Sequence, residues 1–212
     1  MKTTTRQILT EMLERYPALK NCEKDILSVY ETLYACFSNG HRLYLCGNGG
    51  SAADCEHIAG ELLKSFKKCR PIVGAYAEAL KMQGERGQVL VEQLESGLPA
   101  VSLCGHIAFS TALQNDRDPM FVFAQQVNAW GQEGDVLLTI STSGNSKNCL
   151  YAATVAKAKK MNVTALLGGS GGVLKTVADS AVVVPEKETY KVQELHLPVY
   201  HCLCAMLEEE FF

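Results

Sequence analysis

The sequence predicts an α/β fold, a three-layer α/β/α sandwich around a mainly parallel sheet. Short runs of residues are apolar throughout and do not alternate, as expected for strands that are buried on both faces. Segments with helical spacing of apolar residues separate these runs, and polar loops join several runs to the helix that follows. The five runs are RLYLC at 42–46, PAVSL at 99–103, DVLLTI at 135–140, VTALL at 163–167 and SAVVV at 180–184.

Two amphipathic helices are expected before the first strand, at residues 3–16 and 23–37. Pro17 separates them, and Asn21 can cap the second helix. After the strand at 42–46 and its glycine-rich loop, apolar spacing becomes helical from residue 52 onward. We expect Lys67, Lys68 and Arg70 to close this helix, since Pro71 bars its continuation.

The segments between the later strands are predicted to be helical. Apolar spacing gives short helices at 75–82 and 88–94, a helix that starts at 109–113, and a helix from Pro119 to Trp130. After the third strand, a helix is expected at 148–161. A short helix that ends at Ala178 follows the loop at 168–172, and a final long helix is expected at 190–209. The terminal helices carry more apolar surface than one sheet can cover, which predicts a homotetramer.

Composition places the chain among ordinary globular proteins with one domain, residues 1–212. It is 47% apolar and 20% charged with a net charge of −3, so neither nucleic acid nor a membrane is expected as a partner. The first residues lack the apolar region of a signal peptide. Nine cysteines without a CxxC pair are expected to be small buried thiols in a reducing cytoplasm.

Two loops have the composition of an anion site. GNGGS at 47–51 and STSGNS at 141–146 each lie between a buried strand and a helix start. Free N–H groups, the helix dipole and hydroxyl donors favour a phosphate at such positions, outside the carboxyl ends of parallel strands. The plainer alternative is a tight turn at the first loop, with Ser51 as a helix cap, and a capping loop at the second.

His57 and Glu61 lie four residues apart on one predicted helix and therefore share a face of it. Such a pair is common as a solvated ion pair. Next to a phosphate site, an imidazole and a carboxylate indicate acid–base or metal chemistry on a phosphorylated substrate.

Three motifs in this order resemble the sugar-isomerase (SIS) domain family, and most closely its phosphoheptose isomerase branch. They are GNGGSAADxxHIAxEL, DVLLxISTSGNSxN and QExHxxxxH, and the resemblance extends from the N-terminal helices to the last helix. It implies an SIS-type fold flanked by long N- and C-terminal helices. It also implies isomerisation of sedoheptulose 7-phosphate to D-glycero-D-manno-heptose 7-phosphate through an enediol.

The resemblance also implies the site residues. A zinc ion, one per site, would be held by four residues, and the enzyme would be a homotetramer with sites at subunit interfaces. The implied metal ligands are His57, Glu61, Gln193 and His201, with Glu61 as base and His201 as acid. The implied substrate and phosphate ligands are Asn48, Gly49, Ser51, Asp116, Ser141, Thr142, Ser143, Ser146 and Gln193.

Three features depart from the family pattern. Residues 72–97 are an insertion just after the helix of His57, Tyr190 stands where an aspartate is usual, and Pro198 should kink the last helix. His196 is expected to be a packing residue, and His41 and His106 to be surface or loop groups.

Two other functions remain open from the sequence. Some proteins of this family bind without catalysis, either associating with the replication initiator or sensing sugar phosphates as regulators, and others are different sugar-phosphate enzymes. The trio His57, Glu61 and His201 favours the isomerase, because a scaffold has no need of it.

Overall fold

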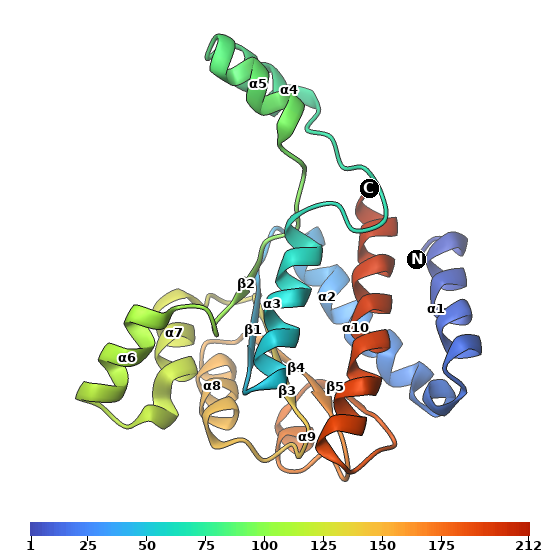
Figure 1. The fold of residues 1–212 in the computed structure, drawn as a ribbon, viewed down its shortest axis with the longest axis vertical. Helices are drawn as coiled ribbons and strands as arrows, with labels where there is room; N and C mark the ends of the chain where they lie inside the picture. Colours follow the sequence, from blue (N-terminus) through green and yellow to red (C-terminus); the bar gives the residue numbers. More distant parts are fainter.

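The computed structural model describes residues 1–212 and confirms the three-layer α/β/α architecture (Figure 1). The sheet has five strands in the order β2-β1-β3-β4-β5, and every neighbouring pair is parallel. The strands are β1 (Leu43–Gly47), β2 (Ala100–Ser102), β3 (Val136–Ser141), β4 (Asn162–Leu167) and β5 (Ser180–Val183). All five expected strands are therefore present, each with boundaries within two residues of the prediction.

Helices cover both faces of the sheet. They are α1 (Thr3–Arg15), α2 (Glu23–Ser38), α3 (Gly50–Leu63), α4 (Gly74–Lys81), α5 (Glu85–Gln93), α6 (Ile107–Asp116), α7 (Val122–Trp130), α8 (Lys147–Ala158), α9 (Leu174–Val177) and α10 (Thr189–Phe211). Short 3₁₀ turns at Pro17–Cys22 and Pro119–Phe121 precede α2 and α7. None of these helices combines the length and the apolar character that a membrane span requires.

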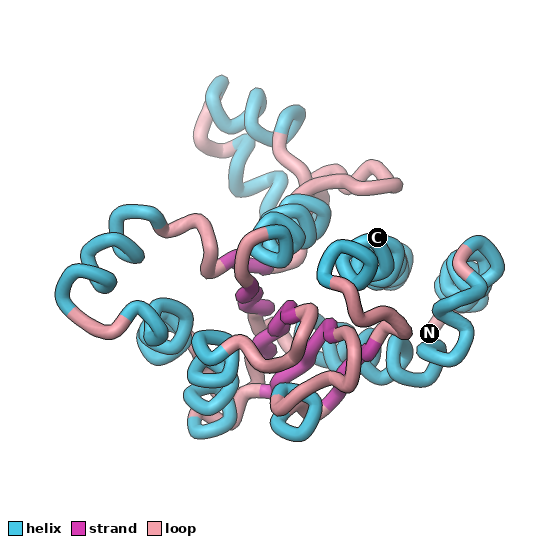
Figure 2. Tube along the Cα trace, turned by 60° about the horizontal axis from the view of Figure 1, so that its bottom comes forward, coloured by secondary structure: helices cyan, strands magenta, loops and turns pink.

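Two buried clusters lie on opposite faces of the sheet, because successive strand residues point to opposite sides. Leu43 and Leu45 of β1 belong to the larger cluster, which α1, α2, α3 and α10 share. Tyr44 and Cys46 belong to the smaller one, with α7 and α8. Figure 2 shows the strands between these two helical layers.

The helix of His57 is shorter at its end than expected. α3 stops at Leu63, and Lys64 is already extended, so the expectation that basic residues occupy its last turn is wrong. Arg70 nevertheless caps this end from outside the helix, since its Nη1 donates to the Leu62 carbonyl at 2.9 Å and its Nη2 to the Glu61 carbonyl at 3.0 Å.

Residues 72–97 form two short helices, α4 and α5, that project away from the body of the protein (Figure 1). Within one chain this hairpin does not cover the face shared by α3 and α10. Its base is tied to α3, because the Glu95 carboxylate accepts from the Ser65 amide at 2.8 Å and Leu98 N–H donates to the Leu62 carbonyl at 2.9 Å.

Pro198 lies inside α10, which continues as one helix from Thr189 to Phe211. The proline removes one N–H donor from the first half of the helix but does not end it. α3 and α10 lie side by side on the same face of the sheet, which brings the third sequence motif close to the first (Figure 1).

Candidate active site

The two polar loops meet at the carboxyl edge of the sheet, because they follow the neighbouring strands β1 and β3. Asn48 and Asn148 join them through two amide hydrogen bonds, one of 3.0 Å from Asn48 Nδ2 and one of 2.7 Å from Asn148 Nδ2. Asn148 is 9% exposed and was given no role from the sequence. Its signal in the sequence is its place as the last residue of the second motif, DVLLxISTSGNSxN.

The glycine-rich loop requires glycine at two points. Gly49 has φ +56°, a left-handed conformation that side chains rarely adopt. A Cβ on Gly50 would lie 2.6 Å from Nε2 of Gln193, so the Gln193 amide rests directly on the first turn of α3. Ser51 is buried in that turn, and it does not cap the helix, whose N-cap is Gly49.

The serine loop is held in shape by its own hydroxyl groups. Ser141 Oγ lies 2.9 Å from Ser146 Oγ and accepts from the Gly144 amide at 3.1 Å. Gly144 has φ +68°, and a Cβ there would meet the Gly171 carbonyl at 1.9 Å. Ser143 is exposed and Thr142 half-buried at the same edge. The loop ends at Ser146, the N-cap of α8, so its hydroxyls lie beside the helix N-terminus where the sequence predicts an anion.

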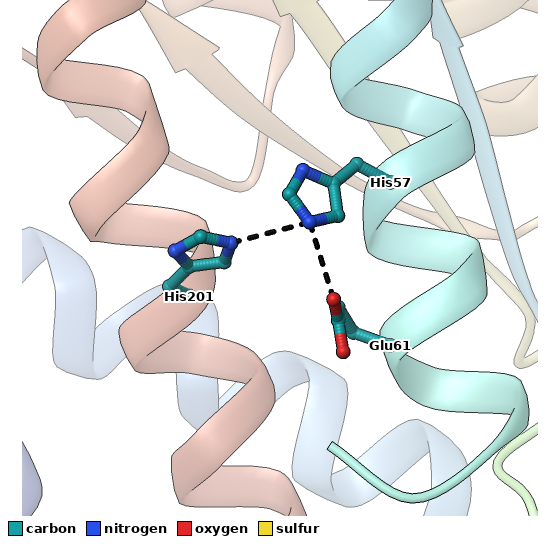
Figure 3. Close-up of side chains that lie close together, drawn as sticks. All are labelled: His57, Glu61 and His201. Atoms are coloured by element: carbon teal, nitrogen blue, oxygen red, sulfur yellow. Dashed lines mark hydrogen bonds and ion pairs between the residues drawn. The ribbon is translucent and has the colours of Figure 1, made fainter. Parts of the chain in front are cut away.

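His57, Glu61 and His201 come together between α3 and α10 (Figure 3). Nε2 of His57 lies 3.1 Å from Glu61 Oε1 and 3.4 Å from Nε2 of His201. The candidate ligand atoms all lie within 4.8 Å of one another. The sequence prediction that these three residues converge agrees with this geometry.

The donor set fits a zinc-type ion. Two imidazoles and one carboxylate leave a fourth position for substrate or water, as in catalytic zinc sites. Burial, and then the neighbouring His57, lower the pKa of His201, which favours the neutral imidazole that a metal ligand needs. Oε2 of Glu61 is buried and has no hydrogen-bond partner in the chain. This orphaned oxygen can complete a metal site or accept a proton.

A buried ion pair holds the two helices of this site together. Arg70 Nε donates to Glu208 Oε1 of α10 at 2.8 Å, and both side chains are almost fully buried. Burial alone would raise the pKa of Glu208, but the amides of residues 66–68 and the Arg70 guanidinium outweigh it and lower that pKa. Because Arg70 also binds the Glu61 carbonyl, the pair fixes the end of α3 against α10 near His201.

Two expected site residues are not brought to the trio within one chain. Gln193 precedes His201 by eight residues, about 12 Å along a helix, and rests on Gly50 instead. Asp116 ends α6, which lies at the edge of the molecule away from α10 (Figure 1). Tyr190 is 56% exposed at the start of α10.

The remaining histidines behave as expected. His196 is fully buried, its Nε2 lies 3.2 Å from the Leu167 carbonyl, and burial lowers its pKa to about 4. His41 and His106 are partly exposed. All nine cysteines are free, and seven of them are buried.

Comparisons with known proteins agree with this architecture. The model of the SIS domain family matches residues 7–96 and 77–168. A phosphoheptose isomerase of Nitratiruptor sp. is 36% identical over 205 residues, which cover 95% of this chain and 96% of that protein. One from Laribacter hongkongensis is 37% identical over 203 residues, covering 94% and 91%.

The solved structure of a phosphoheptose isomerase from Neisseria gonorrhoeae superposes with a TM-score of 0.70 at 32% identity. The match covers 97% of this chain and 99% of that one. The identity exceeds 30% over nearly the whole length of these proteins, in agreement with the fold and with the three sequence motifs. The chain therefore belongs to the phosphoheptose isomerase family of SIS-domain proteins.

Proposed function

We propose that this protein is an aldose–ketose isomerase that converts sedoheptulose 7-phosphate to D-glycero-D-manno-heptose 7-phosphate through an enediol. The observation that carries the proposal is the convergence of His57, Glu61 and His201 beside two phosphate-type loops. Relatives of 36% and 37% identity named phosphoheptose isomerase support the substrate.

In this proposal the substrate phosphate binds to the serine loop, at Ser141, Thr142, Ser143 and Ser146, and to the N-terminus of α8. The glycine-rich loop contributes Asn48, Gly49 and Ser51. His57 lies seven residues beyond Gly50, about 10 Å along α3. A sugar phosphate anchored at the loops therefore extends its other end toward the trio, where the reacting carbons are needed.

Glu61 is the base of the proposed reaction. Its Oε1 faces the two imidazoles, and we assign to this carboxylate the transfer of a proton from C1 of the ketose to C2. His201 exchanges a proton with the sugar oxygens. These two transfers complete the movement of the carbonyl from C2 to C1.

A zinc ion fits the same residues. His57, Glu61 and His201 would hold it, with Gln193 as an additional ligand, and zinc with a position open to the substrate would supply positive charge that polarises the carbonyl. Because Gln193 and Asp116 lie apart from the trio within one chain, we propose that they contribute across subunits of a homotetramer. The exposed Ile107 on α6, a helix without buried residues, supports a contact surface there.

We further propose that residues 72–97 are an insertion into a single SIS domain. The two segments matched by the family model overlap at 77–96, which is consistent with additional chain at this point. A cytoplasmic location fits the seven buried free thiols.

A panel of five- to seven-carbon ketose phosphates, assayed with zinc added and with zinc removed by a chelator, tests the proposal. We expect turnover of the seven-carbon substrate only with zinc. No turnover of any member with zinc supplied would contradict the isomerase and favour a binding protein.

A further inference from the structure

Behind the trio, two more side chains form a chain of hydrogen bonds with His57. Its Nδ1 lies 3.1 Å from the Tyr200 hydroxyl, and that hydroxyl donates to Asp54 Oδ1 at 3.3 Å. Asp54, His57 and Glu61 are spaced by three and four residues, so they share the face of α3 that looks toward α10. Tyr200 directly precedes His201 on α10.

We propose that Asp54 and Tyr200 are positioning residues that set the proton of His57 on Nδ1 and leave Nε2 free to bind a cation. This inference rests on the metal site of the proposed function. It gives a role to Asp54, which the first motif contains without a role in the site, and to Tyr200, which no motif specifies.

The direction of each hydrogen bond in this chain follows from the number of protons available. A tyrosine hydroxyl has one proton, and an ionised carboxylate only accepts. When the Tyr200 proton is donated to Asp54, the hydroxyl oxygen can only accept from His57, which requires N–H at Nδ1. Nε2 then carries a lone pair, and it faces Glu61 and His201 at 3.1 and 3.4 Å. Carboxylate–histidine relays of this kind fix the tautomer of metal-binding histidines.

Asp54 decides the direction of this relay. Without an acceptor at Asp54, the Tyr200 hydroxyl would turn its proton toward Nδ1 of His57. The imidazole would then carry its own proton on Nε2, where it can donate to Glu61 but cannot bind a cation. The carboxylate of Asp54 therefore favours the cation-binding form of a residue that it does not touch.

The Tyr200 ring also has a packing role that must be separated from the relay. It is 2% exposed, and it lies edge-on to His57 and His201, with ring centroids 5.5 and 4.9 Å apart. Phenylalanine keeps this ring and removes only the hydroxyl. Tyr30 on α2 is equally buried at 2%, so Tyr30→Phe is a matched control away from the trio.

The experiment measures zinc affinity by competition with a chelator, without any need for turnover. Tyr200→Phe and Asp54→Ala should each bind zinc about 10- to 100-fold more weakly, the usual effect of removing such a partner. Asp54→Asn keeps an oxygen acceptor and should remain close to wild type, as should Tyr30→Phe. The double variant of Tyr200→Phe and Asp54→Ala should be no weaker than Tyr200→Phe alone, since both changes interrupt one chain.

The proposal is overturned if Tyr200→Phe binds zinc as tightly as wild type, or if the two losses multiply in the double variant. Asp54 is half-buried, so the comparison of Asp54→Ala with Asp54→Asn decides the matter even if Tyr200→Phe folds poorly. Wild-type protein that binds no zinc contradicts the proposed metal site and this inference together. The predicted affinity pattern without turnover contradicts the proposed reaction alone.

Discussion

The ion pair between Arg70 and Glu208 gives the sharpest prediction about how the site is held. Replacing Arg70 by methionine keeps the volume but removes three hydrogen bonds, of 2.8 Å to Glu208 Oε1, 2.9 Å to the Leu62 carbonyl and 3.0 Å to the Glu61 carbonyl. It also removes a cation–π contact, 4.8 Å from the guanidinium carbon to the centre of the Phe212 ring.

The expected loss is large because the partner charge remains buried. Removing one member of a buried pair typically costs about 3–5 kcal/mol, whereas exposed pairs contribute about 0–1 kcal/mol. Arg6→Met breaks the exposed pair of Arg6 with Glu23 and is therefore the matched control. The loss of stability in Arg70→Lys should lie between the losses in Arg70→Met and Arg6→Met. One ammonium group cannot reach all three acceptors as the planar guanidinium does.

Denaturant unfolding followed by circular dichroism measures the free energy of unfolding of each variant. We expect Arg70→Met to lose about 3–5 kcal/mol and Arg6→Met at most about 1 kcal/mol. Zinc binding should weaken in Arg70→Met as well, since the end of α3 that carries Glu61 loses its tie to α10. Equal stabilities of Arg70→Met and Arg6→Met would refute the argument that this pair holds the site together.

Three further predictions concern the phosphate, the pH dependence and the assembly. Ser143→Ala should raise the KM for the sugar phosphate, and a phosphate seen away from the serine loop in a ligand-soaked crystal would contradict this orientation of the site. Burial lowers the pKa of His196 to about 4, so the unfolded chain takes up this proton first as the pH falls below about 6.5. Wild type should therefore lose roughly 3 kcal/mol of stability between about pH 6.5 and 4 through this residue. The free energy of unfolding of His196→Gln should depend less on pH over this range. The same pH dependence in both proteins would contradict this role of His196. Sedimentation at micromolar concentration should give a homotetramer, and a monomer would rule out a site shared between subunits.

Much of the fold could be predicted because its signals are local. Runs such as DVLLTI are apolar on both faces, and the two polar loops mark where each helix begins. His57 and Glu61 could be placed on one helix face from their spacing alone, and the family resemblance added His201.

The missed features depend on contacts between distant parts of the chain. Tyr200 meets His57 across 143 residues, and Arg70 meets Glu208 across 138. No periodicity along α3 or α10 indicates such a pairing. The end of α3 could not be placed for the same reason: Arg70, whose guanidinium caps this end, lies in a loop outside the helix.

The placement of residues 72–97 could not be predicted either. Helical spacing at 75–82 and 88–94 predicted two helices, and both are present as α4 and α5. They project from a base where Glu95 accepts from Ser65, a contact across 30 residues that local sequence does not reveal.

The central claim, proton transfer by Glu61 at a metal-binding trio, is tested most directly by the turnover of Glu61→Gln. The substrate is sedoheptulose 7-phosphate with zinc supplied, and the assembled state is checked for each variant. Glu56→Gln makes the same change at an exposed position of the same helix and should leave turnover unchanged. We predict that Glu61→Gln loses at least about 10²–10⁴-fold in kcat while phosphate binding is retained. Turnover near that of wild type in a correctly assembled Glu61→Gln protein would contradict the account.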